Sequence, residues 1–166
     1  MACRCGEEPL RWKRYGYGPP PDLAWLVAWA SGTIGSLLAV PLAWWLLGRS
    51  RPVQFGLVAV LLVAAMPLCQ LASDSLGGKD DGRIVLDEIA AFPVVVLGQA
   101  AARQPLAMAG AFVAYRLFDI TKPPPAAELE GIPGGVGIVL DDLVAAGYAW
   151  LLVFGGLSLW RRRRSP

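Results

Sequence analysis

The sequence predicts an all-α, membrane-associated helical bundle with about five or six apolar helices. Of its 166 residues, 55% are hydrophobic and only 17% are charged, whereas an average globular domain carries about 25% charged residues. The mean hydropathy is positive, at +0.49. The long apolar runs show neither the alternation of a half-buried strand nor an internal repeat. Together these observations favour helices that contact lipid.

Three regions divide the chain. Residues 1–22 are expected to form a basic flexible leader, residues 23–160 the helical domain, and residues 161–166 a basic C-terminal tail. No N-terminal signal peptide is expected, because the leader is polar, basic and rich in proline. The four arginines of the tail directly follow an apolar stretch, which is typical of a cytoplasmic anchor. A nucleic-acid-binding tail is the weaker alternative, and no nucleic-acid partner is expected.

The first two predicted helices follow long uncharged stretches. Residues 23–47 carry no charge, but "SGTIGS" and Pro41 interrupt the pattern, so one straight helix is not expected there. Residues 53–72 form an uncharged stretch of 20 residues. That is about the length needed to cross a hydrocarbon core.

Three further helices complete the predicted bundle. One is expected near residues 83–97, and the next covers about residues 105–120. The segment "KPPP" ends the second of these, because a residue before proline avoids helical geometry. The last helix is predicted to begin near Asp141, after a glycine-rich turn, and to run through the uncharged residues 143–160.

Histidine is absent from the chain. Its absence excludes Ser-His-Asp catalysis, phosphohistidine chemistry and histidine metal sites. The three cysteines do not form a disulfide framework, because two lie close together in the leader and Cys69 lies in an apolar run. A metal site in this chain would therefore use oxygen ligands, which favours Mg²⁺, Mn²⁺ or Ca²⁺.

Two polar motifs interrupt the apolar stretches in the first half of the chain. In "GTIGS", Thr33 and Ser36 are candidates for binding a phosphate at a helix N-terminus, although a helix cap or glycine packing is the favoured explanation of the motif taken alone. In "DDGRIVLDE", Asp80, Asp87 and Glu88 are candidate catalytic and metal-binding acids. Apolar residues flank the last two, so at least one should turn inward, where a carboxylate is costly unless it is paired, protonated or metal-bound.

Two more polar motifs lie in the second half. In "RLFDITKP", Arg116 and Lys122 are candidates for holding a substrate phosphate and Asp119 is a candidate catalytic acid, whereas a surface Arg116–Asp119 ion pair is the simpler interpretation. In "GGVGIVLDDLVAAG", Asp141 and Asp142 open an apolar stretch, as ordinary capping acids also would. This glycine-rich segment is not a Walker motif, because no Lys-Ser/Thr pair follows it.

The four motifs together point to phosphoryl chemistry. Carboxylates from separate helices that converge on a divalent cation would explain why such a hydrophobic chain carries so many acidic residues. Arg116 and Lys122 would then bind an anionic substrate. The acids that would bind this cation or activate water in catalysis are Asp80, Asp87, Glu88, Asp141 and Asp142.

In their order, the blocks "GTIGSLLAVPL", "DDGRIVLDE", "YRLFDITKPPP", "LE" and "GGVGIVLDDLVA" resemble the phosphatidylglycerophosphatase A family over about residues 16–150. The resemblance implies a magnesium-dependent phosphoric monoester hydrolase that converts phosphatidylglycerophosphate to phosphatidylglycerol and phosphate. It implies a bacterial inner-membrane enzyme whose active site faces the cytoplasm, with a phospholipid substrate and the membrane as partners. Carried over by position, its motif residues are Asp80, Gly82, Asp87, Glu88, Arg116, Asp119, Lys122, Pro123, Gly134, Gly135, Gly137, Asp141 and Asp142.

Two alternatives stay open at the level of the sequence. A CDP-alcohol phosphotransferase also uses magnesium and "DG" carboxylates, but it would require Ala-Arg soon after that pair and more widely spaced aspartates. A non-enzymatic membrane cation-binding protein would use its intramembrane acids to hold ions directly.

Overall fold

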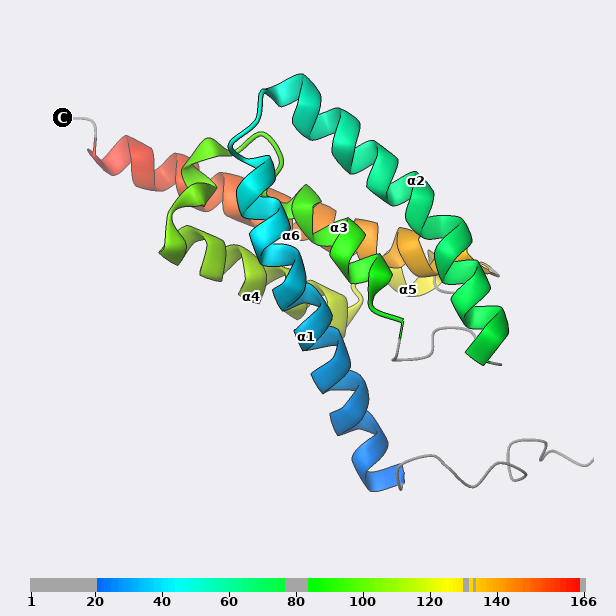
Figure 1. The fold of residues 1–166 in the computed structure, drawn as a ribbon. Helices are drawn as coiled ribbons and strands as arrows, with labels where there is room; N and C mark the ends of the chain where they lie inside the picture. The colour runs from blue at the N-terminus through cyan, green and yellow to red at the C-terminus, as the bar shows by residue number, and fades with distance from the viewer. Residues whose placement is uncertain (1–20, 77–83, 130–131, 133, 165–166) are drawn as a thin grey trace, which may run out of the picture.

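The computed structural model describes residues 21–76, 84–129, 132 and 134–164. All regular elements in these ranges are helical (Figure 1). They are α1 (Pro21–Leu46), α2 (Arg51–Leu76), α3 (Leu86–Val96), the 3₁₀ turn η2 (Ala100–Arg103), α4 (Pro105–Thr121), the single turn α5 (Ala126–Leu129) and α6 (Gly135–Arg164). The predicted all-α class is confirmed.

The expected count of five or six apolar helices is somewhat high. Within the described ranges, the segments long and apolar enough to cross a membrane are Arg51–Ser75 and Gly135–Arg163, by length and composition. Only 17% of the α2 window is buried against the rest of the molecule, compared with 50% of the α6 window. Helix α2 therefore presents most of its apolar surface outward.

Helix α3 is the central element of the bundle. It lies between α1 and α2 and across α6, against which α2 and α4 also pack (Figure 1). Phe92 of α3 is fully buried and meets Tyr115 of α4 edge to face, with ring centroids 5.7 Å apart. On α6 the facing positions are alanines, Ala145, Ala146 and Ala149. Their small side chains let a short helix and a long one approach closely.

The expected interruption of the first helix is wrong, because α1 runs unbroken through "SGTIGS" and Pro41. The reason lies in its contact with α3. A Cβ atom added at Gly35 would lie 2.7 Å from Cβ of Val85, the residue before α3, so only glycine permits this approach. The packing offsets the poor helix propensity of glycine, about 1 kcal/mol relative to alanine.

The last helix also starts earlier than predicted, at Gly135 rather than near Asp141. The Gly135 N–H donates a 2.7 Å hydrogen bond to Oε1 of Gln70 on α2, which satisfies one amide of the first turn. A Cβ atom at Gly135 would collide with the Met66 carbonyl, so the glycine-rich motif is the point where α6 crosses α2. At its other end α6 continues to Arg164, so most of the predicted basic tail is helical.

Candidate active site

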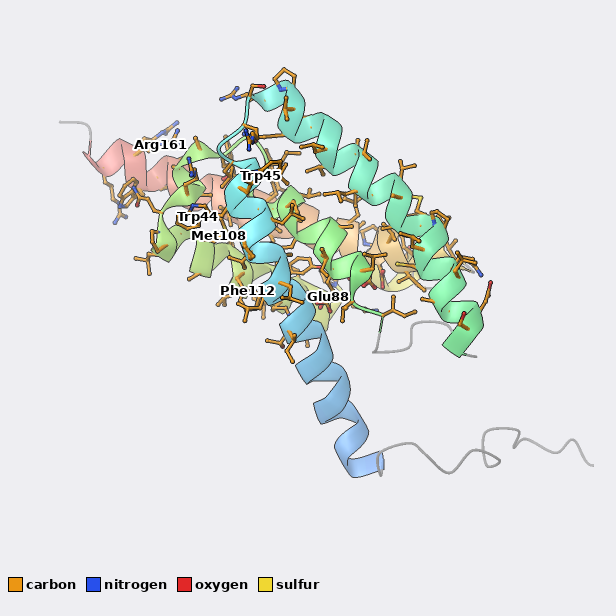
Figure 2. The ribbon with its side chains drawn as sticks, in the orientation of Figure 1. Trp44, Trp45, Glu88, Met108, Phe112 and Arg161 are labelled. Carbon is orange, nitrogen blue, oxygen red and sulfur yellow. The ribbon has the colours of Figure 1, made fainter. Side chains whose placement is uncertain are left out.

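Side chains from α1, α3 and α4 form one polar network near the first turn of α3. Glu88 lies at its centre, beside α1 (Figure 2). Its Oε2 accepts hydrogen bonds from Ser36 Oγ at 2.6 Å and from the Ser36 N–H at 3.1 Å. Its Oε1 meets Arg116 Nη1 at 3.0 Å. Residues 52 and 28 positions away in the sequence thus hold a single carboxylate.

Burial dominates the electrostatics of Glu88. Desolvation raises the pKa of this carboxyl above its ordinary value, and the bonds from Ser36 and the charge of Arg116 oppose that shift. Both Asp87 and Glu88 are buried, with 6% and 9% of their surface exposed. The expectation that at least one of this acidic pair turns inward is confirmed.

Arg116 connects three acceptors through one nitrogen. Its Nη1 lies 2.6 Å from Asp119 Oδ2, 3.0 Å from Glu88 Oε1 and 3.4 Å from Ser36 Oγ. The Arg116 and Asp119 side chains are only 11% and 14% exposed, so their ion pair is not a surface pair. The buried Nε of Arg116 has no hydrogen-bond partner within the described part of the chain. A buried donor without an acceptor is costly, so a ligand oxygen at this nitrogen would be stabilised.

Lys122 links the end of α4 to α6. It caps α4 in a left-handed conformation, with φ 40°, as the proline that follows it disfavours helical geometry. Its Nζ lies 2.9 Å from Oδ2 of buried Asp141. Asp141 therefore sits in the second turn of α6 as the partner of a cation, not at the helix cap.

Asp142 meets a residue that the sequence analysis did not select, Tyr115. The Tyr115 hydroxyl donates a 3.1 Å hydrogen bond to Asp142 Oδ2, and both side chains are buried. Burial, followed by the charge of Asp142, raises the pKa of the Tyr115 hydroxyl well above its ordinary value, so the phenol stays protonated and can donate. The position of Tyr115 directly before Arg116 was the one available signal in the sequence.

The remaining candidates fall into three groups. Asp87 Oδ1 accepts a 2.9 Å hydrogen bond from the backbone N–H of Glu88. The negative charge of Asp87, like those of Asp119 and Asp141, lies close enough to act on the carboxyl group of Asp142. Thr33 lies half-buried on α1, inside the helix and not at its N-terminus. Asp80 lies outside the described residues. The functional roles of all these side chains stay predictions, but the four motifs do come together.

The chemistry of the assembled donors fits an oxygen-preferring cation. The acids that meet here are carboxylates, and the chain has no histidine. In the ranges that the structure describes, however, no three such side chains are grouped closely enough to hold a metal ion. Glu88 and Asp141 are already bound to Arg116 and Lys122. The described residues therefore show no complete ligand set, and the metal-binding roles of Asp80, Asp87, Glu88, Asp141 and Asp142 stay predictions.

Comparisons with known proteins agree with the motif order. Phosphatidylglycerophosphatase A of Escherichia coli (strain K12) is 34% identical over 117 residues, which are 69% of this chain and 66% of that protein. The enzyme of the same name from Haemophilus influenzae is 34% identical over 133 residues, 79% of this chain and 80% of that protein. A Bacteroides thetaiotaomicron protein provisionally named phosphatidylinositol-3-phosphatase is 33% identical over 81 residues, 48% of this chain and 51% of its own.

The chain thus spans between about half and four fifths of the length of these curated relatives. No solved structure matches it. The sequence profile of the family described as phosphatidylglycerophosphatase A matches residues 14–157, which include all four polar motifs. The chain therefore belongs to the phosphatidylglycerophosphatase A family of phosphatases.

Proposed function

We propose that this protein hydrolyses phosphatidylglycerophosphate to phosphatidylglycerol and phosphate at a bacterial inner membrane. The observation that carries the proposal is the buried Arg116 Nε, a donor left without a partner in the described network, beside the acids Glu88 of α3 and Asp119 of α4. A terminal phosphate oxygen is the acceptor that fits there, because arginine binds phosphate through parallel N–H bonds. Names of two relatives support the identity of the lipid.

In this proposal each polar side chain has one task. Arg116 and Lys122 bind the phosphate, and Glu88 and Asp119 hold the Arg116 guanidinium in place from two sides. Ser36 fixes Glu88 in turn. Positive charge held rigidly beside the phosphate stabilises the negative charge that develops on the oxygen atoms during hydrolysis. Attack on phosphorus by a carboxylate and attack by water are distinguished by trapping an aspartyl-phosphate.

The test is phosphate release by the purified chain in neutral detergent. We expect turnover of phosphatidylglycerophosphate to exceed that of phosphatidic acid and of phosphatidylinositol 3-phosphate, the lipid suggested by the name of the Bacteroides relative. If phosphatidylinositol 3-phosphate were the fastest substrate, the chain would still be a lipid phosphatase, but the proposed substrate would be wrong.

Magnesium dependence is part of the proposal. Asp87 and Asp142, with Asp80, are the acids we propose as ligands, because Glu88 and Asp141 already bind cationic side chains. When bound, Mg²⁺ would supply positive charge to the phosphoryl oxygens. EDTA should abolish phosphate release and added Mg²⁺ should restore it, whereas full activity in metal-free buffer would refute this part.

A matched pair of variants tests the acids. Asp87→Asn should lower turnover by orders of magnitude, because the buried Asp87 acts on the network, and the helical content should be kept. Asp74→Asn is the control, since Asp74 is exposed at the end of α2 and accepts a bond from Gln70. Near-normal turnover by Asp87→Asn would remove α3 from the proposed site.

A further inference from the structure

A cavity lies at the far end of the bundle from the acidic network. It has a volume of about 300 Å³ and lies between the start of α2, the turn after α3 and the last turns of α6. Arg51 and Arg161 line it from two helices, together with the aromatic side chains of Phe55, Trp150 and Phe154. Figure 2 shows Arg161 at the α6 end of the bundle, away from Glu88.

The polar side of this cavity suits a phosphate-bearing anion. Two guanidinium groups from separate helices face one space, and guanidinium is the side-chain group that matches phosphate geometry best. Arg51 also begins α2, so the positive end of the helix dipole adds to the attraction.

A buried amide at the same cavity is independent evidence for a ligand. Gln99 is only 6% exposed, and its Nε2 donates to the carbonyl oxygens of Val95 and Trp150 at 3.3 and 3.4 Å. Those bonds fix the amide and leave Oε1 buried with no partner in the described residues. Gln99 lines the cavity, so a hydroxyl group on a ligand there would satisfy this acceptor.

The apolar side of the cavity suits an acyl chain. The rings of Trp150 and Phe154 stack with centroids 5.2 Å apart, and Phe154 remains 51% exposed. Phe55 of α2 is 55% exposed on the facing helix. Both helices are the ones long and apolar enough to cross a membrane, so their exposed aromatic side chains lie where lipid tails would run.

We infer that this cavity binds an anionic phospholipid whose headgroup carries a hydroxyl, with the phosphate at Arg51 and Arg161 and the hydroxyl at Gln99. The site is separate from the acidic network and does not depend on the reaction proposed there. A soluble phosphate would satisfy the two arginines but would leave the aromatic wall without a partner.

Lipid binding to the purified full-length chain in neutral detergent tests the inference. Native mass spectrometry compares dioctanoyl phosphatidylglycerol with dioctanoyl phosphatidylcholine, and the paired arginine variants described below separate lipid in this cavity from lipid at the acidic network. We expect the anionic lipid to bind at least about tenfold more tightly, because its phosphate carries no choline cation that would compete with the two arginines for it. The preference should weaken as salt is raised.

The decisive comparison uses two double variants of equal charge. Arg51→Gln with Arg161→Gln should abolish the preference, whereas Arg162→Gln with Arg163→Gln, on the same helix outside the cavity, should keep it. All four side chains are exposed, so both variants should fold, which circular dichroism checks. An equal loss in the two variants would show a nonspecific charge effect and overturn the inference. Displacement of the lipid by inorganic phosphate alone would assign the cavity to a soluble anion and overturn it as well.

Discussion

At the scale of single residues, the site is a set of charges that are expensive to bury unless each is paired. Glu88 accepts hydrogen bonds from Ser36 and Arg116, and Arg116 in turn contacts Asp119. Removing one member of a buried ion pair typically costs about 3–5 kcal/mol, because the other charge is left uncompensated. The network therefore has little tolerance for conservative changes, and this makes it testable residue by residue.

The geometry of Arg116 predicts a loss of turnover in Arg116→Lys. Lysine keeps the charge but has no planar fork and no Nε–H, so it cannot hold Glu88, Asp119 and a phosphate together. We expect turnover to fall by about 10²-fold or more, as when one donor to a developing charge is removed. Phosphate release at saturating lipid phosphate measures this.

Arg103→Lys is the matched control for this variant. Arg103 is exposed on η2, away from the network, so its replacement should leave turnover near normal. If both variants keep near-normal rates, the Arg116–Asp119 contact is only a structural ion pair and Arg116 does not hold the substrate.

The buried Glu88 carboxyl predicts a pH dependence of stability. Burial raises its pKa above the ordinary value of 4.5, so the folded state binds this proton more tightly than the unfolded chain. The contribution to the unfolding free energy is present below the unfolded value and is lost as the pH rises through the folded one. Thermal unfolding in detergent should therefore show a midpoint that falls as the pH rises above about 4.5, and Glu88→Gln should flatten that slope.

Glu128→Gln serves as the control for this titration, because Glu128 is exposed on α5. Its curve should run parallel to that of the unaltered protein. Parallel curves for Glu88→Gln as well would mean that the Glu88 carboxyl does not change its proton affinity on folding.

At the scale of helices, the approach of α1 to α3 decides whether the network forms. The Cβ atom of an alanine at position 35 would collide with Val85, and it would also lie 3.2 Å from Glu88 Oε2. The α1–α3 contact and the position of the central carboxylate thus depend on the same missing side chain. Helix α1 positions Ser36 only because its neighbour is a glycine.

Gly35→Ala should therefore lower both stability and turnover. Forcing a methyl group into this contact typically costs about 1–3 kcal/mol. Gly110→Ala on α4 is the control, since a Cβ atom there meets nothing within 4 Å and the better helix propensity of alanine should stabilise by up to about 1 kcal/mol. Thermal unfolding and phosphate release of the two variants give the comparison. A neutral Gly35→Ala would contradict the close approach of α1 and α3.

At the scale of the whole molecule, α6 separates two charged ends. Asp142 and Arg161 are 19 positions apart on this helix, about 28 Å at 1.5 Å per residue, close to the thickness of a hydrocarbon core of about 30 Å. Apolar side chains such as Leu151, Leu152 and Leu159 are exposed between them. The family and the two long apolar helices indicate membrane association.

Although α6 is long enough to cross, we predict that it does not: both of its ends lie at the cytoplasmic face, and the bundle is inserted in that side of the membrane. Moving an arginine through the bilayer centre costs about 2.5–3.5 kcal/mol on insertion scales, and the tail carries four of them. Single cysteines at positions 128 and 163, in a chain without its native cysteines, should resist a membrane-impermeant maleimide in intact cells. Both should react after permeabilisation. Labelling of position 163 alone in intact cells would show that α6 crosses the membrane.

By itself, the sequence determined the helical class, the acidic and basic motifs and the family. The long apolar runs lack the alternation of a half-buried strand, which leaves helices as the predicted elements. Several spaced motifs in a fixed order are together specific for one family, although each motif alone is not. Local rules also placed α4 well, because "KPPP" ends a helix through the geometry of proline itself. These features depend on neighbours in the chain, which a sequence displays directly.

Tertiary structure alone decided which charges meet and where two helices begin or continue. The bonds between Glu88 and Ser36, Lys122 and Asp141, and Tyr115 and Asp142 join residues 52, 19 and 27 positions apart, and they follow from helix crossings that no local pattern encodes. Glycine normally weakens a helix, yet α1 continues through Gly35 because α3 packs against that position. Propensity is a difference of about 1 kcal/mol per residue, so the packing of one helix on another outweighs it.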